Sequence, residues 1–326
     1  MKARVLLAVM LLALALTRAG ADQNWSRVRA YQCRRAAAPP VVDGRLDDPC
    51  WQQAEVAGGF VAKGAPRDQP ASPATSVRFC YDDQALYAAF ECQEPNLGAV
   101  TAERRARDFD VYTEDMVGLL LDVGHRRPGH YDLELALSAA GTQYDFGWGL
   151  EEGWQGEWTA ATSRDPAADV WRAELRIPYR DTREPARRGD IWGIQAMRWR
   201  YAGGREEALL WSAVPADLGA EMWSAPVFGH LLFETGDRLV AAYVESAARR
   251  LQAKRGTALA LVKGNPEAGA ALAALYQRLG TLHEQAGRGL ALSGDEWADC
   301  FVEADRLERD YDDLVWPLRI RKLLED

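Results

Sequence analysis

The chain has 326 residues, of which 48% are hydrophobic and 27% charged, and its formal net charge at pH 7 is −9. This balance is typical of a globular protein and argues against a disordered or membrane-embedded chain. Nucleic acid and anionic membrane surfaces are poor candidates as partners, because both repel an acidic protein.

The first 21 residues predict a secretory signal peptide. Lys2 and Arg4 begin the segment, an apolar run from Val5 to Leu16 follows, and Ala19 and Ala21 form a small-residue cleavage pattern. The apolar run is too short to span a bilayer well. We therefore expect a periplasmic or extracellular protein, cut near Ala21. After this cleavage the chain would keep 36 bases against 48 acids, a net charge of −12.

Residues 22–236 predict an antiparallel β-sandwich. Short segments of strand character, separated by Gly, Pro and Asp, fill this region, and alternate residues of the segment 170–178 fall on one polar and one apolar face. Many short strands with turns between them are typical of a sandwich. The segments are 77–83, 85–94, 116–123, 131–138, 142–148, 170–179, 191–201 and 227–234.

A short acidic stretch, VDGRLDDPCW at residues 42–51, precedes these strands. Its spacing does not follow the calcium-binding EF-hand pattern, and no bidentate glutamate closes it. Glycosidases need two carboxylates opposed across a cleft, which adjacent acids on one turn do not supply. We expect a short helix over residues 48–54, with Asp48 as its cap and Pro49 in its first turn.

Five cysteines permit disulfides in an exported protein, and their odd number leaves at least one thiol unpaired: Cys33, Cys50, Cys80, Cys92 and Cys300. A hairpin turn at residues 83–84 would place Cys80 opposite Tyr87 and far from Cys92, so that pair should not bond. A Cys33–Cys50 bridge is the preferred pairing, and buried free thiols are the alternative.

Residues 237–326 predict three antiparallel helices. Apolar residues recur at spacings of four and three, and the segments KGNPEAG and ALSGDEW supply stop, turn and cap residues between the helices. Pro317 should kink or end the third helix. The region carries 13 bases and 15 acids. Its acids are spread over positions expected to face solvent, so they predict no catalytic cluster. The seams are Val240, Val244, Ala247, Leu251, Lys254, Ala258 and Leu261; Leu272, Leu275, Leu279, Leu282 and Ala286; and Cys300, Ala304, Leu307, Tyr311 and Leu314.

Seven motifs follow one another in a specific order along the β region. They are VDGRLDDPCW, VRFCYDDQALYAAFECQEP, TEDMVGLLLD, AAGTQYD, WRAELRIPY, GDIWGIQAMRWR and WSAPVFGHLLFE. This order resembles the family 9 carbohydrate-binding modules and their DOMON-like relatives over residues 28–234, and it does not cover the helical region. The resemblance implies a β-sandwich that binds sugar without catalysis. It also implies that the stretch at 42–51 is an entry corner, where Gly44 allows a tight turn, Asp47 and Asp48 cap the helix, and Trp51 plugs one end of the sandwich.

Sugar-binding members of that family hold a terminal sugar between two tryptophans, beside a glutamate, an arginine and an asparagine. By this resemblance, Tyr112 stands at the first tryptophan and Trp223 matches the second, and a pyranose face would stack on such rings. Gly118, Ala136 and Ser138 stand at the three polar positions. Either other groups bind another glycan, or the slot no longer binds sugar.

The remaining tryptophans fall into two groups. Those within strands are expected to pack in the core or on a sheet face: Trp171, Trp192, Trp199 and Trp211. Trp148, Trp154 and Trp158 lie in or beside a Gly-rich, acidic connection, where an auxiliary sugar platform and simple loop packing both remain open.

The histidines and methionines raise two cofactor hypotheses. His125 and His130 lie in DVGHRRPGHYD, where Pro128 and Gly129 forbid a helix, so a polar hairpin tip is favoured over a metal site. Some DOMON-like relatives bind haem through methionine and histidine, and nothing in the spacing of the candidates selects them: Met116, Met197 and Met222, with His130 or His230. We therefore expect no cofactor.

Together these features predict a secreted or periplasmic, noncatalytic carbohydrate-binding-like protein, accessory to the recognition or degradation of a polysaccharide. A glycan is the expected ligand, and the helical region is expected to serve assembly, attachment or a protein partner. The alternatives are a scaffold protein with a degenerate sugar site, a glycosidase, and a haem-binding protein.

Overall fold

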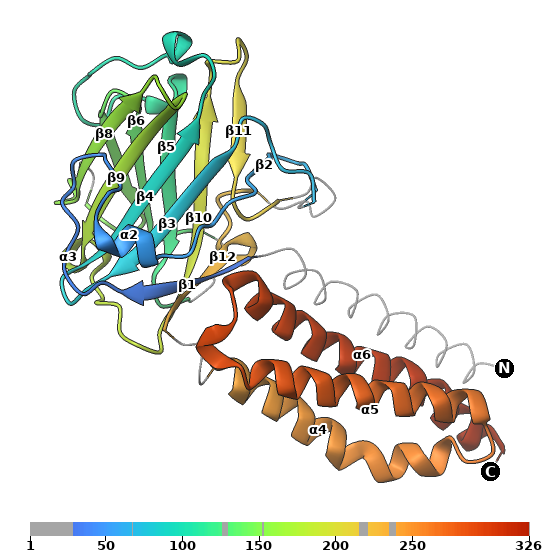
Figure 1. Cartoon of the computed structure of the whole chain (residues 1–326). Coiled ribbons are helices and arrows are strands. Elements are labelled where there is room, and N and C mark those ends of the chain that lie inside the picture. The colour runs from blue at the N-terminus through green and yellow to red at the C-terminus, as the bar shows by residue number, and fades with distance from the viewer. Residues whose placement is uncertain are drawn as a thin grey trace. The chain divides into compact units, whose positions relative to one another are not determined.

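The computed structural model describes residues 29–66, 68–125, 130–151, 153–214, 221–234 and 239–325. They form two compact units, a β unit that ends at residue 234 and a helical unit that begins at residue 239 (Figure 1). The predicted signal peptide, residues 1–21, lies outside the described residues. Within the described ranges, no helix is long and apolar enough to cross a membrane.

The described part of the β unit has twelve strands and two short α-helices, α2 and α3. The strands are β1 (Ala30–Arg35), β2 (Val61–Ala62), β3 (Thr75–Tyr81), β4 (Ala85–Gln93), β5 (Met116–Asp122), β6 (Leu133–Ser138), β7 (Gln143–Gly147), β8 (Thr159–Asp165), β9 (Val170–Pro178), β10 (Ile191–Arg200), β11 (Glu207–Leu210) and β12 (Gly229–Phe233). The helices are α2 (Pro49–Gln53) and α3 (Tyr179–Thr182).

Strand β1 joins the two sheets of the sandwich. Its residues 30–33 pair in parallel with β12, and Arg34 and Arg35 pair in parallel with β3. Sheet one runs β7-β6-β5-β10-β12, with β11 beside β10 and β2 beside β11, and sheet two runs β3-β4-β9-β8. The predicted β-sandwich followed by helices is confirmed, although β1 makes its two pairings parallel.

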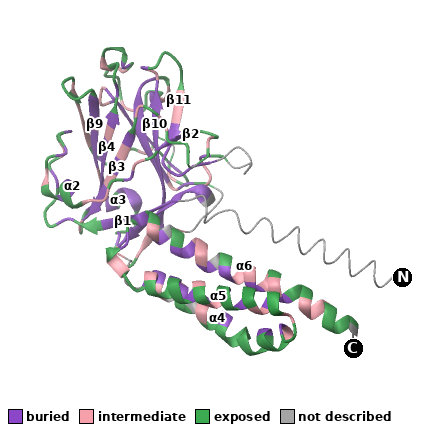
Figure 2. Cartoon of the chain, turned by 45° about the vertical axis from the view of Figure 1, so that its right-hand side comes forward, coloured by how far each residue is buried: buried purple, intermediate pink, exposed green. Residues whose placement is uncertain are grey.

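The main core lies between the two sheets, because alternate residues of each strand point inward. On β9, the apolar face predicted by alternation is buried there: Trp171, Ala173, Leu175 and Ile177. Burying such side chains stabilises the fold by about 1.5–3 kcal/mol for each large one. Figure 2 shows buried residues concentrated in the strands of this unit.

The stretch at 42–51 is a structural corner on the outer face of sheet two. The backbone N–H groups of Asp43 and Gly44 donate to the Glu174 carboxylate at 2.9 and 2.6 Å, and Trp51 Nε1 donates to it at 2.7 Å. Gly44 has a φ of +85°, and a Cβ there would lie 2.9 Å from the backbone of Thr162, so a larger residue does not fit.

Two details of the corner differ from expectation. Asp48 precedes α2, but its carboxylate accepts a hydrogen bond from the Val41 backbone at 3.1 Å instead of capping the helix. Trp51 packs on the outer face of sheet two, against Cys80 and Tyr87, so it does not plug an end of the sandwich. Its indole finds a carboxylate partner there, which explains why it is buried on that face.

The cysteines do not pair as predicted. Cys33 lies in the core between the sheets and Cys50 in the cluster on the outer face of sheet two, so a Cys33–Cys50 bridge is wrong. All five cysteines are free and buried. The predicted hairpin register is confirmed, because Cys80 lies opposite Tyr87 while Cys92 lies opposite Thr75. The thiol that contacts Cys50 is that of Cys80, through a side-chain hydrogen bond.

The helical unit consists of α4 (Leu239–Leu261), α5 (Pro266–Ala286) and α6 (Gly294–Glu325). Many residues of these helices are exposed (Figure 2). Most predicted seam residues are buried, but Val262 and Val315 are buried in place of Leu261 and Leu314. A strict repeat of 3.5 residues drifts around an α-helix, so these neighbours take over at the helix ends. Helix α6 continues past Pro317, which therefore does not end it.

Candidate functional site

The outer face of sheet one carries a cluster of aromatic side chains. Tyr112, in a short helical turn before β5, meets Trp199 of β10 edge to face at 5.0 Å between ring centroids. Trp223 stacks on Trp199 at 6.5 Å with an interplanar angle of 24°. Tyr144 of β7 meets Tyr112 at 6.3 Å, so the cluster extends to the edge of the sheet.

Tyr112 and Trp223 are neighbours, as the resemblance implies, but they do not form two parallel walls. Their ring centroids are 5.9 Å apart and their planes meet at 76°. A sugar between two parallel rings needs a stacking contact of about 3.5–4.0 Å on each side, hence a gap of about 7–8 Å. The gap between these rings is therefore closed, although both side chains remain partly exposed.

A buried carboxylate, Glu134 on β6, lies beneath the cluster and was not anticipated from the sequence. The hydroxyl groups of Tyr112 and Tyr131 donate hydrogen bonds to its two oxygens. Burial raises the pKa of the Glu134 carboxyl, and the two phenol hydrogen bonds lower it without cancelling the effect of burial. Glu134 shares a strand face with Ala136 and Ser138, so alternation alone was the signal that could have found it.

The three positions that depart from the family pattern are filled or buried. A Cβ on Gly118 would lie 2.6 Å from Cε of Met197, so a methionine occupies the space where a polar side chain would stand. Ala136 is fully buried. The Ser138 hydroxyl is also buried and accepts hydrogen bonds from the following turn, including the Thr142 N–H at 3.1 Å. These positions offer no open polar group to a ligand.

A cavity of about 450 Å³ lies beside β7, at the edge of sheet one. Tyr144 lines this cavity and also contacts Tyr112, so the cavity adjoins the aromatic cluster. Three of its lining residues are aromatic and three are acidic. The lining consists of Asp108, Tyr144, Asp145, Phe146, Gly147, Gly149, Leu150, Glu151, Gly153 and Trp154.

The acidic residues of the cavity differ in what they already bind. Asp145 accepts hydrogen bonds from Arg107, from the Gly156 backbone at 3.0 Å and from Trp158 Nε1 at 2.9 Å. Its side chain has no exposed surface, so it holds the loop together. Glu151 is exposed, and its carboxylate has no hydrogen-bond partner in the described part of the chain. It is therefore the acceptor most open to a ligand.

The three tryptophans of the Gly-rich connection take different places. Trp148 is 49% exposed and stacks on His130 at 4.8 Å. Trp154 is partly buried and lines the cavity. Trp158 is 2% exposed and packs in the main core. Trp148 and Trp154 thus present surface to a ligand, and Trp158 does not.

The histidines and methionines named as cofactor candidates contact each other, an aromatic ring or the hydrophobic core. Nε2 of His125 and Nδ1 of His230 are 2.7 Å apart, and the predicted hairpin tip falls mainly on residues 126–129, outside the described residues. Across the residues with described positions, no three His, Cys, Asp or Glu side chains gather to hold a metal ion. Three methionines are buried beneath the aromatic cluster: Met116, Met197 and Met222.

Comparison with known proteins gives similarity in structure only. No family model and no curated protein matches the chain. Two solved structures of a carbohydrate binding module family 9 protein from Caldicellulosiruptor kristjanssonii are similar to it, each with a TM-score of 0.47. The complex with cellotriose is 19% identical and covers 62% of this chain and 93% of its own, and the complex with glucose is 18% identical and covers 62% and 95%. Both structures are of the family that the sequence motifs resemble.

Proposed function

We propose that the protein is a noncatalytic carbohydrate-binding protein and that the cavity beside β7 is its ligand site. The observation that carries this proposal is the pairing, in one cavity, of aromatic rings with an open carboxylate. The apolar C–H face of a sugar packs on a ring, while its hydroxyl groups donate to fixed acceptors. Phe146 and Trp154 supply rings, and Glu151 supplies the acceptor.

The aromatic cluster next to the cavity extends this proposed surface. Tyr144 connects the cavity to Tyr112 and Trp223, so a chain of sugar units that fills the cavity would continue over these rings. The Tyr112–Trp223 pair then serves as one aromatic surface beneath the sugar, not as two walls around it. We further propose a secreted or periplasmic protein that assists the recognition or degradation of a polysaccharide.

The test is affinity electrophoresis of the full chain in gels that contain neutral soluble polysaccharides, with Phe146→Ala as the diagnostic variant. Phe146 is 40% exposed and lines the cavity, so its removal should weaken retention about tenfold or more without unfolding the protein. Phe109→Ala is the matched control, because Phe109 is 37% exposed and does not line the cavity. Equal retention of both variants, or no retention of the parent on any polysaccharide, would overturn the proposal.

A second candidate, an interaction protein that works through its helices, is favoured by one specific observation. Helix α6 presents Trp316, Leu323 and Leu324 with 48%, 74% and 71% of their surfaces exposed. Exposed apolar side chains close together mark protein contacts. If sedimentation shows self-association that disappears in a triple serine variant of these residues, while polysaccharide retention is absent, this second function is the better one.

A further inference from the structure

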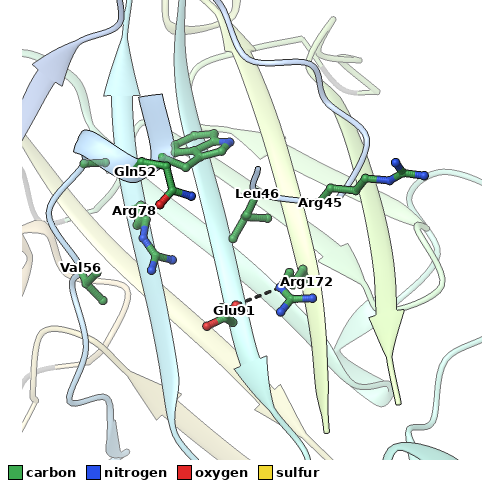
Figure 3. A pocket seen from close by; sticks show the side chains of 9 residues that line it. Arg45, Leu46, Gln52, Val56, Arg78, Glu91 and Arg172 are labelled. Atoms are coloured by element: carbon green, nitrogen blue, oxygen red, sulfur yellow. Dashed lines mark hydrogen bonds and ion pairs between the residues drawn. The ribbon is translucent and has the colours of Figure 1, made fainter. Parts of the chain in front are cut away.

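A second pocket, on the outer face of sheet two, is lined by three arginines. It has a volume of about 350 Å³ and lies between the corner segment and strands β3, β4 and β9 (Figure 3). Arg78 comes from β3, Arg172 from β9 and Arg45 from the corner segment. Glu91 of β4 is the single acidic residue of this lining. The pocket is therefore locally basic in a protein whose net charge is −9.

Strand register explains why these side chains meet. Glu91 lies directly opposite Arg172, and Arg78 lies opposite Ala89, two positions along β4 from Glu91. Residues two apart on a strand share a face, so all three charged side chains project from the outer surface of sheet two. The same face is covered at its other end by Leu46 and Trp51 of the corner, which gives the pocket an apolar boundary.

Two of the three guanidinium groups of the pocket already pair with carboxylates. Arg172 Nε donates to Glu91 at 2.9 Å, and its Nη1 donates to Asp165 at 3.3 Å. Arg45 Nε lies 3.8 Å from the Asp43 carboxylate, and both side chains are exposed to solvent. The Arg78 side chain is half-buried and has no hydrogen bond or ion pair with any residue in the described ranges. One guanidinium thus faces the pocket without a counter-ion.

We propose that this pocket binds an acidic sugar, with the carboxylate of a uronate seated on Arg78. The planar fork of a guanidinium donates two parallel hydrogen bonds to a carboxylate, and one unpaired arginine matches one singly charged group. Gln52 at the rim supplies an amide for sugar hydroxyls, and Leu46 supplies apolar contact. The pocket belongs to the other sheet from the cavity beside β7, so this inference does not rest on the proposed function.

Calorimetric titration of the full chain with sodium glucuronate at low ionic strength tests the proposal. Glucose is the uncharged comparison, and inorganic phosphate and sulfate are the comparison anions. Arg78→Gln should weaken glucuronate binding about tenfold to a hundredfold, because a charge-assisted pair is lost, and it should melt like the parent because Arg78 has no partner to lose. Arg164→Gln is the matched control: Arg164 is exposed on β8, outside the pocket, and its loss should leave binding unchanged.

The outcomes separate clearly. Selective binding of glucuronate that weakens in Arg78→Gln and in high salt supports the pocket. Absence of saturable glucuronate binding by the parent, equal binding by Arg78→Gln, equal affinity for glucose, or tighter binding of phosphate or sulfate would each overturn it. Retention of the parent and of Arg78→Gln on neutral polysaccharides tests the cavity beside β7 separately. Either site can therefore be refuted without the other.

Discussion

The rings of Tyr112 and Trp223 meet edge to face, with their centroids 5.9 Å apart. The Tyr112 hydroxyl is held by Glu134 beneath it, and Trp223 stacks on Trp199 at its side. The two residues are therefore parts of one packed surface and both contact Trp199, but only Tyr112 also donates a hydrogen bond to Glu134. Substitutions of the two should consequently differ in their effects.

Trp223→Ala should reduce polysaccharide retention more than Tyr112→Phe. Removing a central aromatic commonly costs about 2 kcal/mol of binding free energy, roughly thirtyfold in affinity, whereas phenylalanine keeps the ring of Tyr112. Affinity electrophoresis measures both variants, and thermal melts of each must accompany it because Trp223 also packs on Trp199. Parent-like retention of Trp223→Ala with an unchanged melt would show that the ligand does not reach this pair.

Glu134→Gln should flatten the pH dependence of stability. Burial raises the pKa of Glu134, so the folded state holds this proton more tightly than the unfolded state, whose glutamate pKa is about 4.3. The contribution of the protonated Glu134 to the free energy of unfolding is fully present below the unfolded pKa, and it is lost as the pH rises through the folded pKa. Urea unfolding from about pH 4 to pH 8 should show this loss in the parent and not in the variant. Parallel curves for the two proteins would refute the assignment.

Glu94→Gln should strongly destabilise the β unit. Glu94 has no exposed surface and accepts from Arg198 Nη2 at 3.0 Å and Arg200 Nε at 2.6 Å. Removing one partner of a buried ion pair costs about 3–5 kcal/mol, because the other charge stays buried. Glu207→Gln is the control, since Glu207 also pairs with Arg200 but is 19% exposed, and its loss should cost less. Denaturant unfolding followed by tryptophan fluorescence gives both values, and equal effects would contradict this ranking.

Cys50 should be the first thiol to react with an alkylating reagent. A hydrogen bond from Cys80 lowers the pKa of Cys50, whereas burial raises the pKa of Cys92 to about 12 and that of Cys300 to about 11. Burial also raises the pKa of Cys33. Because the thiolate is the reactive form, mass spectrometry after brief labelling at about pH 8 should find the label on Cys50. Labelling in urea, where all five thiols should react, is the control, and early labelling of Cys33 or Cys92 would count against the prediction.

Deletion of residues 237–326 should leave the β-sandwich folded. The sandwich core is built from residues within 31–233, and the helices bury a separate set of side chains, including Leu272, Leu279 and Leu307. The shortened protein should keep its β circular dichroism spectrum and a cooperative melt. Aggregation or a broad melt would mean that the helices complete the fold of the sandwich.

The strong periodic signals carried most of the fold. Alternation along β9 identified both of its faces, and the turn at residues 83–84 set the register that places Cys80 opposite Tyr87. Four strands lie outside the predicted segments, namely β1, β2, β8 and β11. β2 has two residues, and β8 is rich in small and polar residues of intermediate burial, so neither shows a hydrophobic alternation.

The candidate site was less predictable, because it depends on how side chains tilt and fill space. The motifs placed Tyr112 and Trp223 near each other, but no spacing in the chain encodes the 76° angle between their rings. Nor does the sequence reveal that Met197 fills the space over Gly118, because Met197 lies on a strand about 80 residues further along the chain. The cavity beside β7 likewise forms only once the Gly-rich connection folds back over that strand.

The passage of β1 from one sheet to the other has a consequence for synthesis of the chain. Ala30 pairs with His230 and Cys33 with Phe233, so the earliest strand of the sandwich needs the last one as its neighbour. Contacts this distant in sequence close late and slow the search for the native state. A chain that leaves a ribosome or a translocation channel from its N-terminus therefore cannot finish the sandwich until residue 233 has emerged, and until then β1 presents an unpaired edge that a chaperone or a second unfinished chain can occupy.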